Sequence, residues 1–384
     1  MHGNSSSVEP LSSDYDEMRQ RSALEKQQTI VDKDEKNSKF IPKGNKREQR
    51  HEQKRLYEIH QIQNSELVDK AIIISSLIFY LILFIASRFV SLKFKKFYKL
   101  SYKYEDSDYY DIGFDDLYFG IFWIINLLFL RSFLILFCFN PCAKLLGIKK
   151  FKATQRFIEQ AWSMVYYSFS WGFGFYLYYN SDYYLDCYNI YANWPHDVLS
   201  APMKFYYLLQ SASWFQQFIV LHIESRRKDH YQMLAHHIIT CILTTASYSL
   251  YFTRIGHVIL LLMDIVDVFL STAKILKYAG FQTVCDLMFL FFMVSWIIFR
   301  HGVYNYVLWF TATRARDIMG NKCSTFLPSE TYKACYTDLQ VDIFMLLLVA
   351  LQVIMCIWMY MIFRVAFHVI SGGSADDVRS DSDD

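Results

Sequence analysis

Two histidines and two aspartates interrupt otherwise apolar stretches within residues 222–280. His236 and His237 are adjacent in one apolar run, and Asp264 and Asp267 lie three residues apart in the next run. Ionisable side chains at the depth of a bilayer are costly unless they face a protein interior or a polar cavity, so they mark functional sites. These four side chains are therefore the candidate site of the chain.

Acyl transfer is a reaction that imidazole and carboxylate groups can carry in such a place. A histidine can take a proton from an attacking amine or hydroxyl, or it can attack an activated acyl group itself. A nearby carboxylate can orient the imidazole or stabilise its protonated form. The residue types leave open which of the two roles the histidine has.

Helical spacing predicts how these groups face one another. Asp264 and Asp267 share one helix face and are expected to point together into a cavity. His236 and His237 point about 100° apart, so one faces that cavity while the other braces it or bonds elsewhere. A hairpin that turns at 253–256 places the histidines nearer the cytosol and the carboxylates nearer mid-membrane, which predicts a polar shaft open to the cytosol.

A basic cluster precedes the two histidines. Arg226, Arg227 and Lys228 lie in the short link 224–231, and basic side chains of this kind hold phosphate groups. The cluster is expected to bind the phosphates of a soluble acyl carrier. An equally good interpretation is topological, because Lys and Arg gather in cytosolic loops.

The elements that must position these residues are membrane spans, and the fold class predicted is an all-α polytopic membrane protein. The chain of 384 residues is 53% hydrophobic and 18% aromatic, and its apolar runs of about 20 residues are long enough to cross a bilayer, without the alternation of a β-barrel. The net charge of +2 gives no indication of nucleic acid binding, because the charges lie in a tail and short loops. About eight transmembrane helices are expected, at residues 71–90, 117–139, 157–179, 203–223, 232–252, 257–276, 284–310 and 339–363.

Loop charges predict the sidedness of these spans. With both termini in the cytosol, the Lys- and Arg-rich loops 140–156, 224–231 and 274–283 are cytosolic, and the loop 180–202 is lumenal. Loop 91–116 does not fit this rule, because its lysines would face the lumen, although an acidic run follows them.

Composition divides the chain into four parts. The polar N-terminal tail is too poor in apolar residues to fold alone and is expected to be disordered in the cytosol, with a helical tendency from Lys46 that leads into the first span. Two spans and their loop follow, and then the part that holds the hairpin 222–280. The predicted boundaries are 1–66, 67–154, 155–365 and, for the acidic cytosolic tail, 366–384.

Cysteine positions predict one disulfide. Cys323 and Cys335 share the loop 311–338, which this topology places in an oxidising lumen. Cys187 would be lumenal too and could compete, so the connectivity stays open. The cysteine and histidine spacings fit no zinc site, and no metal is expected.

Two sequence runs carry a family resemblance. The runs are ESRRKDHYQMLAHHIIT (224–240) and LLMDIVDVFLSTAKIL (261–276), and together they resemble the signature of the ceramide synthases, the longevity-assurance family of TLC-domain membrane proteins. The resemblance covers about residues 155–365. Arg300, in WIIFRHGVY, resembles an arginine that family members carry in a later span. The long polar N-terminal tail, the acidic C-terminus and the lack of a homeobox-like insert are similar to fungal members.

The resemblance implies a six-helix TLC bundle around a membrane cavity in the endoplasmic reticulum. Its reaction would transfer a fatty acyl group from acyl-CoA to the amine of sphinganine or phytosphingosine, giving dihydro- or phytoceramide without a bound cofactor. Fungal members typically use very-long-chain acyl-CoA and associate with a small single-span accessory subunit. A homodimer, or a heterodimer with a paralogue, is expected as well.

The resemblance also assigns roles by position. His236 and His237 would be the catalytic pair, with His236 favoured to contact the acyl carbonyl as nucleophile or base, and Asp264 and Asp267 would be their acidic partners. Arg300 would bind substrate, although pairing with a carboxylate as a structural residue is the alternative. The residues assigned to substrate binding are Arg226, Arg227, Lys228 and Arg300.

Two other functional classes are weighed against acyl transfer. Di-iron lipid hydroxylases and desaturases need many histidine ligands, whereas the spacing H-x7-H-x5-H-H from His222 to His237 is not repeated later in the chain. A non-catalytic TLC-domain lipid sensor or carrier would keep the helical bundle and dispense with acid–base residues. The presence of both histidines and both aspartates argues against that alternative.

The C-terminal tail carries candidate phosphorylation sites. Four serines lie among acidic residues, a setting that an acidophilic kinase such as casein kinase 2 accepts. A tail that only solubilises the chain end is the alternative. The four residues are Ser371, Ser374, Ser380 and Ser382.

Overall fold

The computed structural model describes residues 46–224, 229–320, 322 and 334–370 of the chain. Contacts divide the chain into two units, Met1–Asn64 and Ser65–Asp384. In the first unit the described residues belong to helix α2 (Lys46–Ile85), which continues into the second unit, so the helical tendency expected from Lys46 is confirmed.

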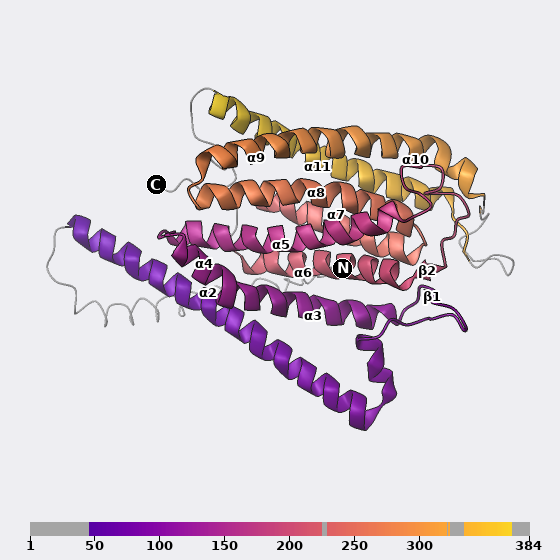
Figure 1. Cartoon of the computed structure of the whole chain (residues 1–384), viewed down its shortest axis with the longest axis horizontal. Helices are drawn as coiled ribbons and strands as arrows, with labels where there is room; N and C mark the ends of the chain where they lie inside the picture. Colours follow the sequence, from indigo (N-terminus) through magenta and orange to yellow (C-terminus); the bar gives the residue numbers. More distant parts are fainter. Residues whose placement is uncertain (1–45, 225–228, 321, 323–333, 371–384) are drawn as a thin grey trace, which may run out of the picture. The chain divides into compact units, whose positions relative to one another are not determined.

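The second unit is a bundle of long helices that lie side by side (Figure 1). The order of the elements along the chain confirms an all-α architecture with several membrane-spanning helices. Its main helices are α3 (Asp116–Leu134), α5 (Phe151–Tyr179), α6 (Ala201–Ile223), α7 (His230–Ser249), α8 (Thr253–Tyr278), α9 (Gln282–Ser295), α10 (Tyr304–Met319) and α11 (Asp338–Ile370).

Shorter elements connect or extend these helices. Three π-helical segments prolong α2, α3 and α9, and a short α-helix precedes α5. They are η2 (Ala86–Val90), η3 (Leu92–Phe97, a 3-10 helix), η4 (Ile135–Phe139), α4 (Asn140–Leu145) and η5 (Trp296–Val303).

Each predicted span lies on one or more of these helices. Among the described residues, four stretches are long and apolar enough to cross a membrane, His60–Val90, Asp116–Leu145, Gln282–Met319 and Asp338–Phe367. The other four predicted spans coincide with α5, α6, α7 and α8. These four helices are less apolar because they carry the polar groups of the bundle interior.

The chain also forms a small sheet that the sequence did not predict. Strand β1 (Tyr109–Tyr110) pairs antiparallel with β2 (Leu199–Ser200), just before α6 begins. Beside this sheet, Lys204 Nζ donates to the carbonyl oxygens of Ser101 (2.9 Å) and Asp111 (2.6 Å) and so ties this loop to α6.

Helix α6 begins at a sequence signal of the usual kind. The Ser200 hydroxyl accepts a hydrogen bond from the Met203 backbone N–H (3.4 Å), and Pro202 lies in the first turn, where its missing N–H costs nothing. Further along the bundle, Gly256 in α8 lies against the Tyr207 hydroxyl of α6, where a Cβ would collide. The two helices can therefore approach closely and form the wall of a narrow interior.

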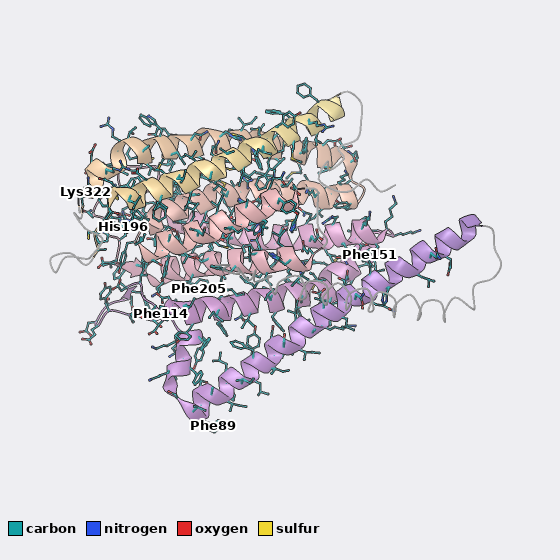
Figure 2. All side chains as sticks on the ribbon, turned by 180° about the vertical axis from the view of Figure 1, so that it is seen from behind. Phe89, Phe114, Phe151, His196, Phe205 and Lys322 are labelled. Carbon is teal, nitrogen blue, oxygen red and sulfur yellow. The ribbon has the colours of Figure 1, made fainter. Side chains whose placement is uncertain are left out.

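The bundle has two ends that differ in chemistry. We call the site end the one where α5 and α7 begin and α6 and α8 end, and the loop end the opposite one. Figure 2 shows Phe151 at the site end, and Phe114, His196 and Lys322 at the loop end.

Several sequence predictions fall partly or wholly outside the described residues. These are the tail 1–45, the basic cluster Arg226–Lys228 and the serines of 371–384. Cys335 is disulfide-bonded and Cys187 is a free thiol, but Cys323 is not among the described residues, so the predicted pairing stays a prediction. The four-part division of the chain also stays a prediction.

Candidate active site

A polar cavity of about 200 Å³ lies at the site end of the bundle. Helices α3, α5, α6, α7, α8 and α11 and the segment η5 all contribute to its wall. The residues that matter for chemistry are His236, His237, Asp267, Arg300, Trp214 and Trp358.

His236 is held between two indole rings. Its ring centroid lies 5.3 Å from that of Trp214 and 5.2 Å from that of Trp358, both in edge-to-face geometry. Its Nδ1 atom is buried and has no hydrogen-bond partner among the described residues. The ring is therefore oriented by aromatic contacts, and Nδ1 keeps its hydrogen-bonding capacity.

His237 is braced by the backbone of its own helix. Its Nδ1 lies 2.7 Å from the Met233 carbonyl oxygen, so Nδ1–H is the donor and Nε2 keeps the free lone pair of a neutral ring. The planes of the His236 and His237 rings are 89° apart, with 5.6 Å between centroids. The expected divergence of the two neighbours is therefore present, although both rings line the cavity.

Asp267 forms an ion pair with Arg300 in the cavity wall. Arg300 Nη2 lies 2.8 Å from Asp267 Oδ2 and also donates to the Met263 carbonyl oxygen at 3.1 Å. The guanidinium stacks on the Trp296 ring at 4.3 Å. Arg300 thus has the carboxylate partner that the structural alternative foresaw, while it also faces the cavity.

Asp264 occupies a different environment from Asp267. It is 1% exposed and accepts hydrogen bonds from Ser170 Oγ (2.6 Å) and Gln210 Nε2 (2.7 Å). Asp264 is not among the residues that line the cavity. Side chains from α5 and α6 enclose this carboxylate, so the expectation that both aspartates point into one cavity holds only for Asp267.

An apolar pocket of about 80 Å³ continues from the polar cavity toward the loop end. His236 and Trp214 line both spaces, so they mark the junction. The hydroxyls of Thr240 and Thr244 donate to carbonyl oxygens of their own helix. The exposed surface of the pocket is almost entirely apolar, which suits a hydrocarbon chain.

Two ion pairs include residues that line the polar cavity. Arg131 Nη2 lies 2.6 Å from Glu224 Oε1, and Arg156 Nη1 lies 2.9 Å from Glu159 Oε2. Glu224 and His230 line the cavity on either side of the undescribed basic segment.

Some residues of the site escaped sequence reasoning. Ser170 and Gln210 are intramembrane polar residues and could have been flagged for that reason. Trp214 and Trp358 carry no such signal, because aromatic residues are abundant throughout this chain.

The fold and the site together define a polytopic membrane protein whose helical bundle encloses a histidine-containing cavity. The family description "TLC domain" matches residues 156–364. A sphingosine N-acyltransferase-like protein of Alternaria alternata is 40% identical to this chain, over 72% of this chain and 69% of the relative.

Two yeast relatives point to the same branch of the family. The sphingosine N-acyltransferase lag1 of Schizosaccharomyces pombe is 38% identical, over 74% of this chain and 72% of the relative. The ceramide synthase LAG1 of Saccharomyces cerevisiae is 35% identical, over 75% of this chain and 69% of the relative. The chain therefore belongs to the TLC-domain family, in its ceramide synthase branch, and the resemblance read from the sequence is confirmed.

Proposed function

We propose that this chain is a sphingoid base N-acyltransferase, which transfers a fatty acyl group from acyl-CoA to the amine of sphinganine or phytosphingosine. The relatives named above carry this activity in their names. One observation supports it most: His236 lies where a polar cavity meets an apolar pocket. A fatty acyl thioester has the same division between a polar carrier and an apolar chain.

The two spaces divide the acyl donor between them. The hydrocarbon chain would occupy the apolar pocket, and the CoA moiety would lie in the polar cavity, with its phosphates toward the mouth and the cluster Arg226–Lys228. The thioester carbonyl would then meet His236 at the junction. Very-long-chain acyl groups are the finer proposal, drawn from the resemblance.

The side chains can then carry the reaction in a definite order. The amine must lose a proton before or as it attacks the thioester carbon, and a histidine nitrogen can accept that proton. The departing CoA sulfur takes up a proton, so the histidine is restored. His236 would act at the carbonyl as nucleophile or base, and His237 would present Nε2 beside it. Asp267 would offset the positive charge of a protonated histidine, while its partner Arg300 contacts the substrate.

Asp264 has an indirect part in this proposal. Its contacts tie α8 to α5 and α6, so it would fix the position of Asp267 one turn away. We therefore assign it as a positioning residue within the predicted catalytic set.

Cellular setting and partners extend the proposal beyond the site. The protein would reside in the endoplasmic reticulum membrane with both termini in the cytosol, so that the site end opens toward cytosolic acyl-CoA. A small single-span accessory subunit and a homo- or heterodimer with a paralogue are proposed partners. The disulfide between Cys323 and Cys335 and phosphorylation of Ser371, Ser374, Ser380 and Ser382 also belong to the proposal; mass spectrometry of non-reduced peptides and of the tail tests both.

The direct test is an assay on purified protein in lipid nanodiscs, with acyl-CoA donors of increasing length and sphinganine as acceptor. Ceramide formation with stoichiometric release of free CoA is the expected result. Variants that remove each ionisable group in turn serve as controls, namely His236→Ala, His237→Ala, Asp264→Asn and Asp267→Asn. Binding of both lipids without turnover would instead indicate the lipid sensor or carrier, and four fully active variants would contradict the site.

A further inference from the structure

Four residues that line the polar cavity each have a buried polar atom with no hydrogen-bond partner among the described residues. The atoms are His236 Nδ1, Arg300 Nε and Trp358 Nε1, and a fourth is Gln216 Nε2. Buried polar groups are paired in the great majority of cases, and an unpaired group calls for an explanation. All four residues belong to one cavity lining, so a ligand bound there is the nearest candidate for the missing partners.

Two of these atoms can only donate. The indole N–H of Trp358 and the Nε–H of Arg300 have no acceptor capacity, so the partner they lack is an acceptor oxygen. The Trp358 ring lies 5.2 Å from that of His236 between centroids, and it also contacts Trp296, on which Arg300 stacks. The two donors therefore belong to the same cluster of rings as the histidine.

Acyl transfer creates an acceptor oxygen at this place. When a nitrogen attacks the thioester carbon, a C–N bond forms and the π bond of the carbonyl breaks, with its electron pair moving onto oxygen. The electron pair on oxygen then re-forms the carbonyl, the C–S bond breaks, and CoA sulfur leaves with the C–S bonding pair and takes the proton that the attacking nitrogen has lost. The oxygen bears the charge in this intermediate whether His236 or the amine attacks first.

We propose that the indole N–H of Trp358, with the Nε–H of Arg300, stabilises the oxyanion that forms on the acyl carbonyl beside His236. The assignment rests on the proposed acyltransferase function and adds a catalytic residue to it. Donors already fixed in place need no reorganisation as the charge develops, which makes them effective. Trp358 comes from α11, the last described helix, so this helix would complete the site.

The alternative explanation for Trp358 is packing alone. Its ring contacts His236 and Trp296, and it is 5% exposed. A packing role requires only the ring, whereas an oxyanion role requires the N–H. Trp358→Phe separates the two, because phenylalanine keeps an aromatic ring and removes the donor.

The experiment measures ceramide formation by the full-length protein in nanodiscs. Trp358→Phe is expected to lower kcat by about 10²-fold, the usual effect of losing one oxyanion donor, with little change in KM. Its affinity for a thioether analogue of acyl-CoA, which lacks the carbonyl oxygen, should equal that of the unmodified protein. Trp123→Phe is the matched control: its buried indole N–H also lacks a described partner but lies outside the cavity wall, so its kcat should not change.

Three outcomes would overturn the assignment. Trp358→Phe could retain full kcat, it could lose kcat and thioether affinity together, as a packing defect predicts, or Trp123→Phe could lose activity to the same extent. Failure of the proposed function has a different signature, because the unmodified protein would then bind acyl-CoA without forming ceramide.

Discussion

Lys204 and His257 at the loop end of the bundle contrast with His236 at the site end in how completely their polar atoms are bonded. At the loop end, Lys204 is 0% exposed, lies 2.8 Å from Asp116 and also donates to two backbone carbonyls. His257 is equally buried, with Nδ1 bonded to the Tyr183 hydroxyl (2.8 Å) and Nε2 to the Gly174 carbonyl (3.0 Å).

At the site end, buried polar groups stand around a cavity with bonding capacity left over. His236 Nδ1 and Trp358 Nε1 have no partner among the described residues. A buried group whose bonds are complete stabilises the fold, whereas one whose bonds are incomplete is costly unless a ligand completes them. The comparison separates Lys204 and His257, whose bonds are complete, from His236 and Trp358, which we propose act on the substrate.

The largest expected effects come from replacing two histidines at opposite ends of the bundle. His236→Ala should lower ceramide formation by about 10³-fold or more, because acid–base or nucleophilic chemistry is lost, with an unchanged unfolding midpoint. His257→Ala should instead destabilise the fold by about 2–4 kcal/mol, since it opens a cavity and leaves two buried groups unpaired. Activity per folded molecule and thermal unfolding in detergent distinguish the two, and a stable but inactive His257→Ala would break the comparison.

The ion pair at the loop end should matter for stability alone. Lys204→Met leaves the Asp116 carboxylate buried without its cation and is expected to cost about 3–5 kcal/mol. Adding Asp116→Asn should recover part of that loss, because the buried charge disappears. Unfolding in mixed micelles measures both variants, and if the double variant proves less stable than Lys204→Met, the pairing argument fails.

The two aspartates of α8 offer a matched pair within one helix. Asp267→Asn removes the carboxylate partner of Arg300 inside the cavity and should lower kcat by about 10²-fold, as expected for a displaced oxyanion donor. Asp264→Asn keeps an acceptor for Ser170 and Gln210 and should lower kcat by less than about tenfold. Steady-state kinetics gives kcat for both variants. If kcat falls equally in the two, lining the cavity does not explain the different roles assigned to Asp264 and Asp267.

The smallest expected effect is a pH dependence at the loop end. Burial, together with nearby Arg254, lowers the pKa of His196 to about 4, while its Nε2–H donates to the Ala192 carbonyl oxygen at 2.9 Å. Because the unfolded chain binds the proton more readily, stability is present above about pH 6.5 and is lost as the pH falls toward 4, by about 2 kcal/mol at pH 5. The free energy of unfolding should therefore be lower at pH 5 than at pH 7.5, and His196→Gln should reduce this difference. If the difference is unchanged in that variant, other groups cause the pH dependence.

The lengths of the apolar runs predicted most of the fold, because the thickness of the bilayer sets how long a membrane-spanning helix must be. All eight predicted spans coincide with helices, and both histidines lie in one cavity wall. The same reasoning was less successful for Asp264, because its environment depends on Ser170 and Gln210 in two other helices. A local spacing rule assigns a residue to a helix face but does not identify the helix packed against it.

The contribution of the later helices could not be predicted for two physical reasons. Arg300 lies in η5, a π-helical segment, so faces assigned with 3.6 residues per turn do not apply there. Trp358 is one aromatic residue among many in an apolar span, and only the assembled bundle brings it against His236. Long-range packing, and not local pattern, selects these two residues.

The central claim is that the acyl chain lies in the apolar pocket with its thioester at His236. An acyl-CoA with a photoreactive group at the chain end tests this most directly, when it is activated on the full-length protein in nanodiscs and the crosslinked residues are mapped. The account predicts crosslinks to pocket residues such as Leu243, Ile259 and Leu348, abolished by excess natural acyl-CoA. Ile238 and Ile242 lie on α7, as Leu243 does, but face outward, with 43% and 47% of their surface exposed. Crosslinks confined to such outward-facing residues would contradict the claim.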